Sequence, residues 1–270
     1  MPHKTNIGRL NKKAIYQLAA DWQAAGVQEG DMLLVHSSIR RILRRLVKME
    51  AAASPSMVLE SFLLALGKSG TLLLPLFNFD FTKSIAFDIR NTPSHMGILT
   101  EAGRFWPGAI RTGHPIYSFA VIGKDAKVFH GLKNFSGYGA DSPFGILHRL
   151  GGKIAVLDLP DQNSMTFYHY VEETLNANYR YHKIFTGQYI DEEGHESTQN
   201  FSLFVRNIEQ GVVTRVEAMG EILWEKGIYT GSRPNQDCGL RVIRTTKLFD
   251  EVATILDQGL AKGILYDIEQ

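Results

Sequence analysis

Short apolar runs, each bounded by glycine, serine or charged residues, recur along the chain. Four of them predict buried strands, at residues 32–36, 71–74, 118–123 and 153–159. Uninterrupted apolar runs of this length are typical of strands that are covered on both faces of a sheet. The pattern therefore favours a central sheet enclosed by other elements.

Segments with helical periodicity and helix-ending signals lie between these runs. The first helix is expected to start at Asn11 as N-cap and to end at Gly26. The pair Ser54-Pro55 predicts a second helix start, and Gly67 predicts its end, because these residues favour the N-cap, N1 and C′ positions. Further helices are expected over 96–105, 163–178 and 246–262.

Residues 184–216 have the pattern of a β-hairpin. Two strand-like segments, 188–190 and 201–205, flank the polar turn sequence DEEGHE. Alternating strands and helices argue for a sheet with helices on both faces, and a hairpin adds antiparallel strands. We therefore predict an α/β protein with a three-layer α/β/α architecture and a mixed central sheet, in a single domain spanning 1–270.

Composition narrows the range of partners. The net charge is +1, and 44% of the residues are hydrophobic against 21% charged, so no global field favours nucleic acid or a membrane surface. Cys238 is the single cysteine, which excludes an intrachain disulfide and a cysteine-based zinc site. The N-terminal residues lack the apolar stretch of a signal peptide. A soluble, cytoplasmic protein is expected.

The segment 153–173 carries the strongest local chemical signal. It runs from a buried strand through a polar turn, in which Asn163 or Ser164 can cap the next helix, into TFYHYVEE. Ligands in open α/β sheets bind where strands end in this way. Thr166, His169 and Glu172 follow at intervals of three and form a slanted row on one side of the helix.

Glu173 lies four residues after His169 and is also within its reach. A histidine at a helix N-terminus tends to stay neutral because of the helix dipole, and a carboxylate one turn later can orient it. Such a ring can act as a general base toward an amine. The same spacing also fits a purely structural pair, or a metal site for which no further ligand is evident.

Other segments offer weaker candidates for binding an anion or a thioester. Ser37 and Ser38 follow the first buried strand, where hydroxyl and backbone N–H groups can meet a phosphate, although helix capping explains them equally well. From Arg40 to Lys48, five of nine residues are basic. This run fits either a phosphate contact or the solvated face of an amphipathic helix.

Two loops add further polar residues. His114 precedes a proline, which biases its backbone toward extended geometry, although a structural loop histidine is the simpler reading. The turn YGADSPF contains Asp141 and Ser142, whose side chains can bond their own backbone. Cys238 follows an aspartate, which does not favour a reactive thiolate.

Taken together, these segments resemble the aminoglycoside 3-N-acetyltransferase family. The similarity is carried, in order, by LLVHSSIR, GTLLLPLFNF, NTPSHMGILTEAGRFWPGAIRTGHPIYSFAVIG, DSPFGIL and TFYHYVEE. It covers most of the chain and weakens after residue 215. The resemblance implies an enzyme that transfers an acyl group from acyl-CoA to a substrate amine in a ternary complex.

The resemblance also implies roles for individual residues. It assigns His169 as the general base, with Glu172 orienting it and Thr166 lining the same site. It places coenzyme A near Ser37, Ser38 and Arg40, with weaker contacts from the two loops. These weaker cofactor candidates are His114, Ser118, Asp141 and Ser142. No metal is implied, and a homodimer is compatible with the family.

The acceptor is expected to be an amino sugar. Binding a polycationic aminoglycoside requires several carboxylates, yet the loop FNFDFTKSIAFDIR offers only Asp80 and Asp88. A nucleotide-linked amino-deoxysugar is therefore an equal or better candidate, with Phe79 able to stack on a ring and Asp80 or Glu173 able to bind the amine. The alternatives are a hydrolase or metal-dependent enzyme using the same residues, and a non-catalytic protein that binds coenzyme A or a nucleotide.

Overall fold

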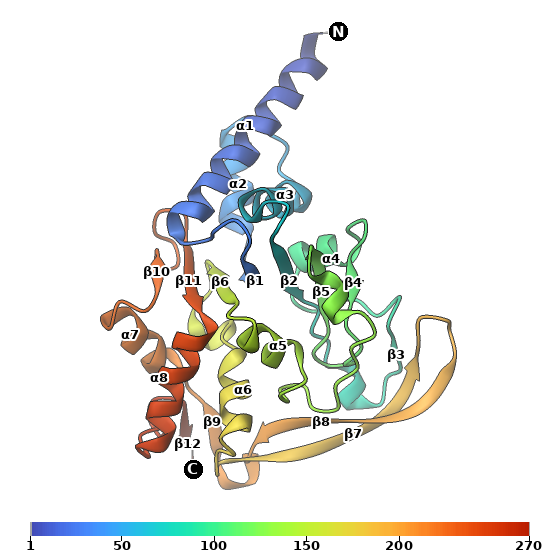
Figure 1. Ribbon diagram of the computed structural model, residues 1–270, viewed down its shortest axis with the longest axis vertical. Helices are drawn as coiled ribbons and strands as arrows, with labels where there is room; N and C mark the ends of the chain where they lie inside the picture. The colour runs from blue at the N-terminus through green and yellow to red at the C-terminus, as the bar shows by residue number, and fades with distance from the viewer. Residues whose placement is uncertain (1, 270) are drawn as a thin grey trace.

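The computed structural model describes residues 2–269, with side chains from Ile7 onward. Its centre is a seven-stranded sheet in the order β10-β11-β6-β1-β2-β5-β4, drawn in Figure 1. The strands are β1 (Met32–Ser37), β2 (Thr71–Pro75), β4 (Ile110–Arg111), β5 (Phe119–Gly123), β6 (Lys153–Leu157), β10 (Thr230–Gly231) and β11 (Leu240–Arg244). Strands β6, β1 and β2 are parallel, whereas β5 and β11 run antiparallel to their neighbours. The predicted mixed sheet is confirmed.

Helices cover both faces of this sheet. One layer contains α1 (Pro2–Ala25), α2 (Arg40–Lys48), α3 (Pro55–Leu66) and α4 (Ile98–Arg104). The other contains α5 (Pro143–Arg149), α6 (Phe167–Thr174), α7 (Glu217–Glu225) and α8 (Thr245–Asp257). Along β1, Leu33 and Val35 pack with the first layer and Leu34 with the second, as the alternation of side chains in a strand requires. The three-layer α/β/α prediction is confirmed.

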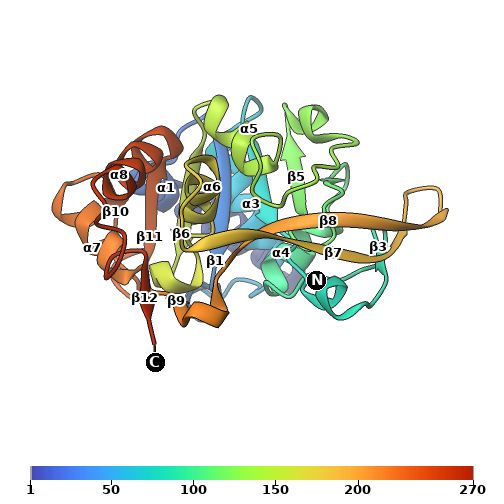
Figure 2. The same cartoon turned by 90° about the horizontal axis from the view of Figure 1, so that it is seen from below.

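A long hairpin crosses the molecule beside the central sheet (Figure 2). Its strands β7 (Arg180–Ile190) and β8 (Glu196–Arg206) pair antiparallel over eleven residues, and β3 (Phe87–Asp88) adds to β7. The hairpin prediction is confirmed, and both strands are longer than expected. Smaller elements are β9 (Val212–Thr214), β12 (Tyr266–Ile268) and the 3-10 turns Asp80–Lys83, Ala126–Phe129, Asp161–Asn163 and Ile208–Gln210.

Local sequence signals predicted both ends of the second helix, α3, correctly, but they predicted the start of the first helix, α1, incorrectly. Ser54 accepts a hydrogen bond from the Met57 amide as N-cap of α3, and Gly67 ends that helix with a φ of 64°. In contrast, α1 continues to Pro2, so Asn11 is not its N-cap. The Asn11 side chain instead accepts a hydrogen bond from the Ala52 amide at 2.8 Å. A tertiary contact thus uses the group that was expected to cap the helix.

Two further boundaries differ from prediction. α6 begins at Phe167, and Ser164 does not cap it, because its hydroxyl donates to the Pro160 carbonyl at 2.7 Å within a preceding 3-10 turn. α8 ends at Asp257, since Gly259 at a φ of 70° closes it one turn before the expected end. Among the described helices, none has both the length and the apolar character required to cross a bilayer.

Candidate active site

A small cavity lies where the parallel strands of the central sheet end. Its volume is about 210 Å³. The segment after β2 contributes Phe77 and Phe79, and the segment after β6 contributes residues 161–166 and His169. Met96, Tyr117, Thr214 and Val216 complete the wall. The sheet topology therefore brings two distant segments to one pocket at the carboxyl ends of the strands, where α/β proteins bind ligands.

His169 occupies the first turn of α6 and faces this cavity. Its Nδ1 lies 2.7 Å from Glu172 Oε2, one helical turn later. The His169 side chain is 19% exposed, and no described residue hydrogen-bonds its Nε2. The Tyr138 ring packs against the imidazole at a centroid distance of 5.3 Å. The ring is thus held by one nitrogen and leaves the other available to a ligand.

Glu172 is buried and held by three groups. Its Oε1 accepts a hydrogen bond from the Tyr179 hydroxyl at 2.7 Å, and its Oε2 lies 2.8 Å from Arg180 Nε. The Arg180 N–H does not point at this oxygen, so the contact is an ion pair rather than a linear hydrogen bond. With His169 on the same oxygen, the carboxylate has a fixed orientation.

Electrostatics favour a neutral imidazole beside an ionised carboxylate. Burial lowers the pKa of His169, and Arg180 lowers it further, against the opposite effect of Glu172. For Glu172, burial acts to raise the pKa, but Arg180 and His169 outweigh it and the net pKa is lowered. The pair can therefore accept a proton at Nε2 while the carboxylate stabilises the resulting cation.

A buried ionic network forms the wall of the cavity next to this pair. Asp161 pairs with Arg241 at 2.7 Å and accepts hydrogen bonds from the Tyr168 and Tyr229 hydroxyls. The sequence pattern did not predict this network. Asp161 and Arg241 lie 80 residues apart, and Arg241 is one of two arginines in the short strand segment LRVIR, so no local pattern joins the two partners.

The predicted site residues fall into two groups. Thr166, His169 and Phe79 line the cavity together, with Glu172 behind the imidazole. Phe79 is 38% exposed and lies edge-on to Tyr117. The other acidic candidates point elsewhere: Asp80 lies 3.4 Å from His95, and Glu173 accepts a hydrogen bond from Ser136 at 2.7 Å.

The structure distributes the cofactor candidates over several elements. Ser37 ends β1 and is half-buried, the Ser38 amide donates to the Leu157 carbonyl at 2.8 Å, and Arg40 is exposed at the start of α2. In the same basic run, Arg41 pairs with Asp158 at 2.9 Å and Arg45 pairs with Asp21. Part of this run therefore ties α2 to neighbouring segments.

Three of the four remaining cofactor candidates have structural partners. His114 is fully buried, and its Nδ1 accepts hydrogen bonds from the amides of Ile116 and Tyr117. Ser118 is buried and accepts a hydrogen bond from Arg111. Ser142 caps α5, whereas Asp141 before it is exposed. The structure does not gather these four with His169 in the described cavity.

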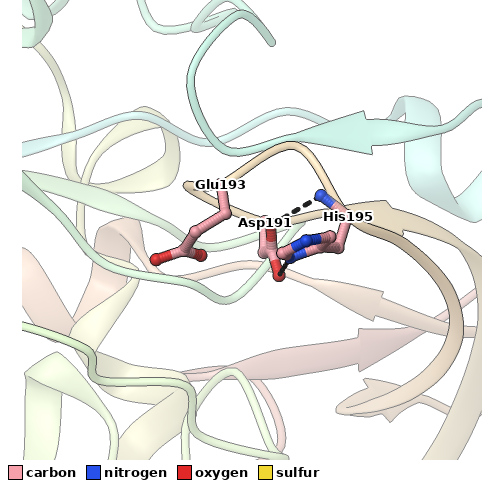
Figure 3. A group of neighbouring side chains, drawn as sticks. All are labelled: Asp191, Glu193 and His195. Atoms are coloured by element: carbon pink, nitrogen blue, oxygen red, sulfur yellow. Dashed lines mark hydrogen bonds and ion pairs between the residues drawn. The ribbon is translucent and has the colours of Figure 1, made fainter.

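Metal-ligand geometry occurs at a different place. Within residues 2–269, one group of three potential ligands has its ligand atoms within 4.8 Å of each other: Asp191, Glu193 and His195. Figure 3 shows these side chains in the turn between β7 and β8. Asp191 accepts a hydrogen bond from the His195 amide at 2.8 Å, and Glu193 and His195 are exposed. Contacts within the turn account for the group, which includes no member of the His169 site.

A second cavity, of about 650 Å³ and thus larger than the one at His169, lies at the opposite edge of the sheet around the start of β6. Two of its lysines are already paired, Lys153 with Asp31 at 2.7 Å and Lys226 with Glu251 at 2.5 Å. No member of the His169 pair lines it.

Comparison with known proteins identifies the family. The sequence model described as aminoglycoside 3-N-acetyltransferase matches residues 34–257. The chain belongs to this family. It is 28% identical over 181 residues to aminoglycoside N(3)-acetyltransferase VII of Streptomyces paromomycinus. That alignment covers 60% of this chain and 60% of the relative's own length.

Solved structures of the family share the fold. The aminoglycoside acetyltransferase AAC(3)-Xa superposes with a TM-score of 0.76 at 20% identity, over 95% of this chain and 99% of its own. AAC-IIIb, solved as a binary complex with CoASH, gives a TM-score of 0.74 at 20% identity, over 90% and 95% of the two chains. The predicted family resemblance is confirmed.

Proposed function

We propose that this protein transfers an acyl group from acyl-CoA to an amine of an amino sugar, with His169 as general base. The observation that carries the proposal is the orientation of the imidazole. Nδ1 is fixed by the buried Glu172, while Nε2 is left unbonded by the described residues at a cavity that ends the parallel strands. Family membership and the CoASH complex of one structural neighbour support the choice of donor.

In the proposed reaction, the residues of the site act in successive steps. The substrate nitrogen attacks the thioester carbonyl carbon, a C–N bond forms, and the displaced N–H proton moves to His169 Nε2. The tetrahedral intermediate then collapses with cleavage of the C–S bond. The imidazolium returns the proton to the departing thiolate, which leaves as coenzyme A thiol. Glu172 stabilises the transient imidazolium, and Thr166 lines the site.

Contacts to acyl-CoA are proposed for the segment after β1. Ser37 is the last residue of the parallel strand β1, Ser38 and Arg40 follow it, and this strand ends at the same edge of the sheet as the cavity. Serine hydroxyls there can polarise the thioester oxygen, and Arg40 is exposed and free to meet a phosphate. His114, Ser118, Asp141 and Ser142 remain weaker candidates, because each except Asp141 is buried with protein partners.

The charges around the cavity bear on the acceptor. Asp161 is the only carboxylate in its lining, and Arg241 already neutralises it. Asp80 lies beside Phe79 but also faces His95 and Lys83. A polycation gains little from such a lining. We therefore propose an acceptor with few positive charges, such as a nucleotide-linked amino-deoxysugar stacked on Phe79, alongside the aminoglycosides for which the relatives are named.

A thiol-release assay tests the proposal. Acetyl-CoA and hydroxyacyl-CoA are each offered with a panel of aminoglycosides and nucleotide-linked amino sugars. Acceptor-dependent thiol release with at least one pair is expected, and mass spectrometry should show the acylated amine. Absence of release across the panel, combined with no binding of coenzyme A by calorimetry, would contradict acyl transfer.

A further inference from the structure

Arg180, the first residue of β7, contacts Glu172, the residue that holds the His169 imidazole. Its side chain is 5% exposed, and its Nε lies 2.8 Å from Glu172 Oε2, the same oxygen that contacts His169 Nδ1 at 2.7 Å. Its Nη1 donates to the Phe204 carbonyl at 2.9 Å, and its Nη2 lies 3.5 Å from Thr214 Oγ1. Contacts with Phe204 in β8 and Thr214 in β9 thus hold the Arg180 guanidinium in place.

The positive charge of Arg180 affects the protonation of His169 through the net charge of the buried cluster. A buried carboxylate paired only with an imidazole favours the protonated ring, because Glu172 with an imidazolium is neutral overall. With Arg180 present, Glu172 is already neutralised. Protonation of His169 then places a net positive charge in a buried cluster, which is unfavourable. A Glu–His pair without the arginine would therefore tend to hold the proton that a general base must lack.

The other charged or titratable groups facing His169 do not replace this effect. Arg206 lies opposite Arg180 in the ladder, but its side chain is exposed. Asp161 lines the same cavity but is neutralised by Arg241. Tyr138 and Tyr179 are held in their neutral forms, since burial raises the pKa of both hydroxyls.

We propose that Arg180 is a positioning residue, which fixes the ionised Glu172 against His169 and keeps the imidazole neutral before substrate arrives. The inference rests on the proposed function for its catalytic meaning, but the protonation state of His169 is measurable without turnover. The directions of the pKa shifts of His169 and Glu172 agree with it, because Arg180 lowers both.

The test is an NMR titration of His169 in the full-length protein, without substrate, in Arg180→Met and in wild type. The variant is expected to raise the pKa of His169 by about one unit, the usual size for removal of a charge at this range. Arg180→Lys keeps the charge and is expected to stay near wild type. Arg206→Met, on the facing strand, is the matched control and should shift the pKa much less.

Kinetics separates this inference from the proposed function. Where acyl transfer occurs, Arg180→Met should move the acid limb of kcat/KM upward by the same amount as the NMR shift. An unchanged His169 titration in folded Arg180→Met overturns the inference, even if His169→Ala is inactive. A shifted titration in a protein that releases no thiol overturns the proposed function alone. If Arg180→Met fails to fold, the same titration of His169 is made in Arg180→Gln, which keeps a side-chain donor for the Phe204 carbonyl. An unchanged pKa of His169 in that variant overturns the inference.

Discussion

Glu172 and His169 form the central contact of this protein, with Oε2 and Nδ1 2.7 Å apart across one turn of α6. The carboxylate is 1% exposed, whereas the imidazole reaches a cavity. In the proposed reaction this asymmetry separates their roles: the buried carboxylate orients the ring, and the partly exposed ring takes the proton. Several consequences of this arrangement can be measured.

Substitution of Glu172 by Gln should destabilise the fold. The change removes the countercharge of Arg180, which is 5% exposed. An unpaired buried charge of this kind costs about 3–5 kcal/mol in the free energy of unfolding. Urea unfolding at pH 7 measures the loss. Glu173→Gln is the matched control, since Glu173 accepts a neutral hydrogen bond from Ser136 that an amide oxygen can preserve. Equal stability of the two variants would contradict a buried ion pair.

The pH dependence of kcat/KM should show a histidine pKa below the ordinary value, if His169 is the general base. The base must be neutral, so activity is lost as the pH falls through the pKa of His169, which burial and Arg180 lower from 6.5. The acid limb should therefore lie below pH 6.5. Two acceptors whose amines differ in pKa distinguish the ring from the substrate, because only the limb due to His169 stays in place. A limb that follows the amine in every case would remove His169 from this role.

Two other histidines should make stability depend on pH. Burial lowers the pKa of His36 to about 3, with Arg241 contributing, and burial lowers the pKa of His114 to about 3 as well. Between pH 6.5 and 3 the unfolded chain binds more protons than the folded one. Stability is then complete above pH 6.5 and falls as the pH decreases, by about 1.4 kcal/mol per pH unit for each ring.

His36→Phe tests this linkage. The variant retains an aromatic side chain beside Phe77 but cannot be protonated. Urea unfolding between pH 5 and 6 should show a slope that is smaller by about 1.4 kcal/mol per pH unit. An unaltered slope in His36→Phe would show that this ring is charged in the folded protein.

A methyl group at Gly220 should disturb the cavity wall. A Cβ there would lie 2.7 Å from Asp161 Cγ and 2.8 Å from its Oδ2, so the buried carboxylate would have to move. Gly220→Ala is expected to lower stability by about 1–3 kcal/mol, as overpacking does. Gly8→Ala in α1 is the control, because a Cβ there meets nothing within 4 Å and alanine favours a helix by up to about 1 kcal/mol. Thermal unfolding should shift in opposite directions.

The parts of the fold set by local physics were predictable, and those set by tertiary pairing were not. The apolar runs gave β1, β2, β5 and β6, because continuous burial requires continuous apolar sequence. β11 escaped prediction since Arg241 interrupts its apolar run, and that arginine is buried in pairing with Asp161 and in donating to the Leu159 carbonyl. α5 and α7 are short helices without a strong periodic signal.

In the candidate site, too, the features set by local sequence were predictable and those set by tertiary pairing were not. The spacing of Thr166, His169 and Glu172 on one helix was enough to place them together, and Glu172 rather than Glu173 meets the ring. Arg180 lies beyond the helix, at a position where the pattern gave no strand, and its role depends on how the hairpin packs under α6. Contacts that depend on how two elements pack leave no periodic trace in the sequence.

The most direct test of general-base catalysis by His169 is turnover by His169→Ala in the thiol-release assay. The variant is expected to lose about 10²–10⁴-fold in kcat, the range for a general base, with its affinity for coenzyme A retained in calorimetry. His130→Ala, an exposed histidine outside the cavity lining, should behave as wild type. Wild-type turnover in folded His169→Ala would contradict the assignment of His169 as the general base.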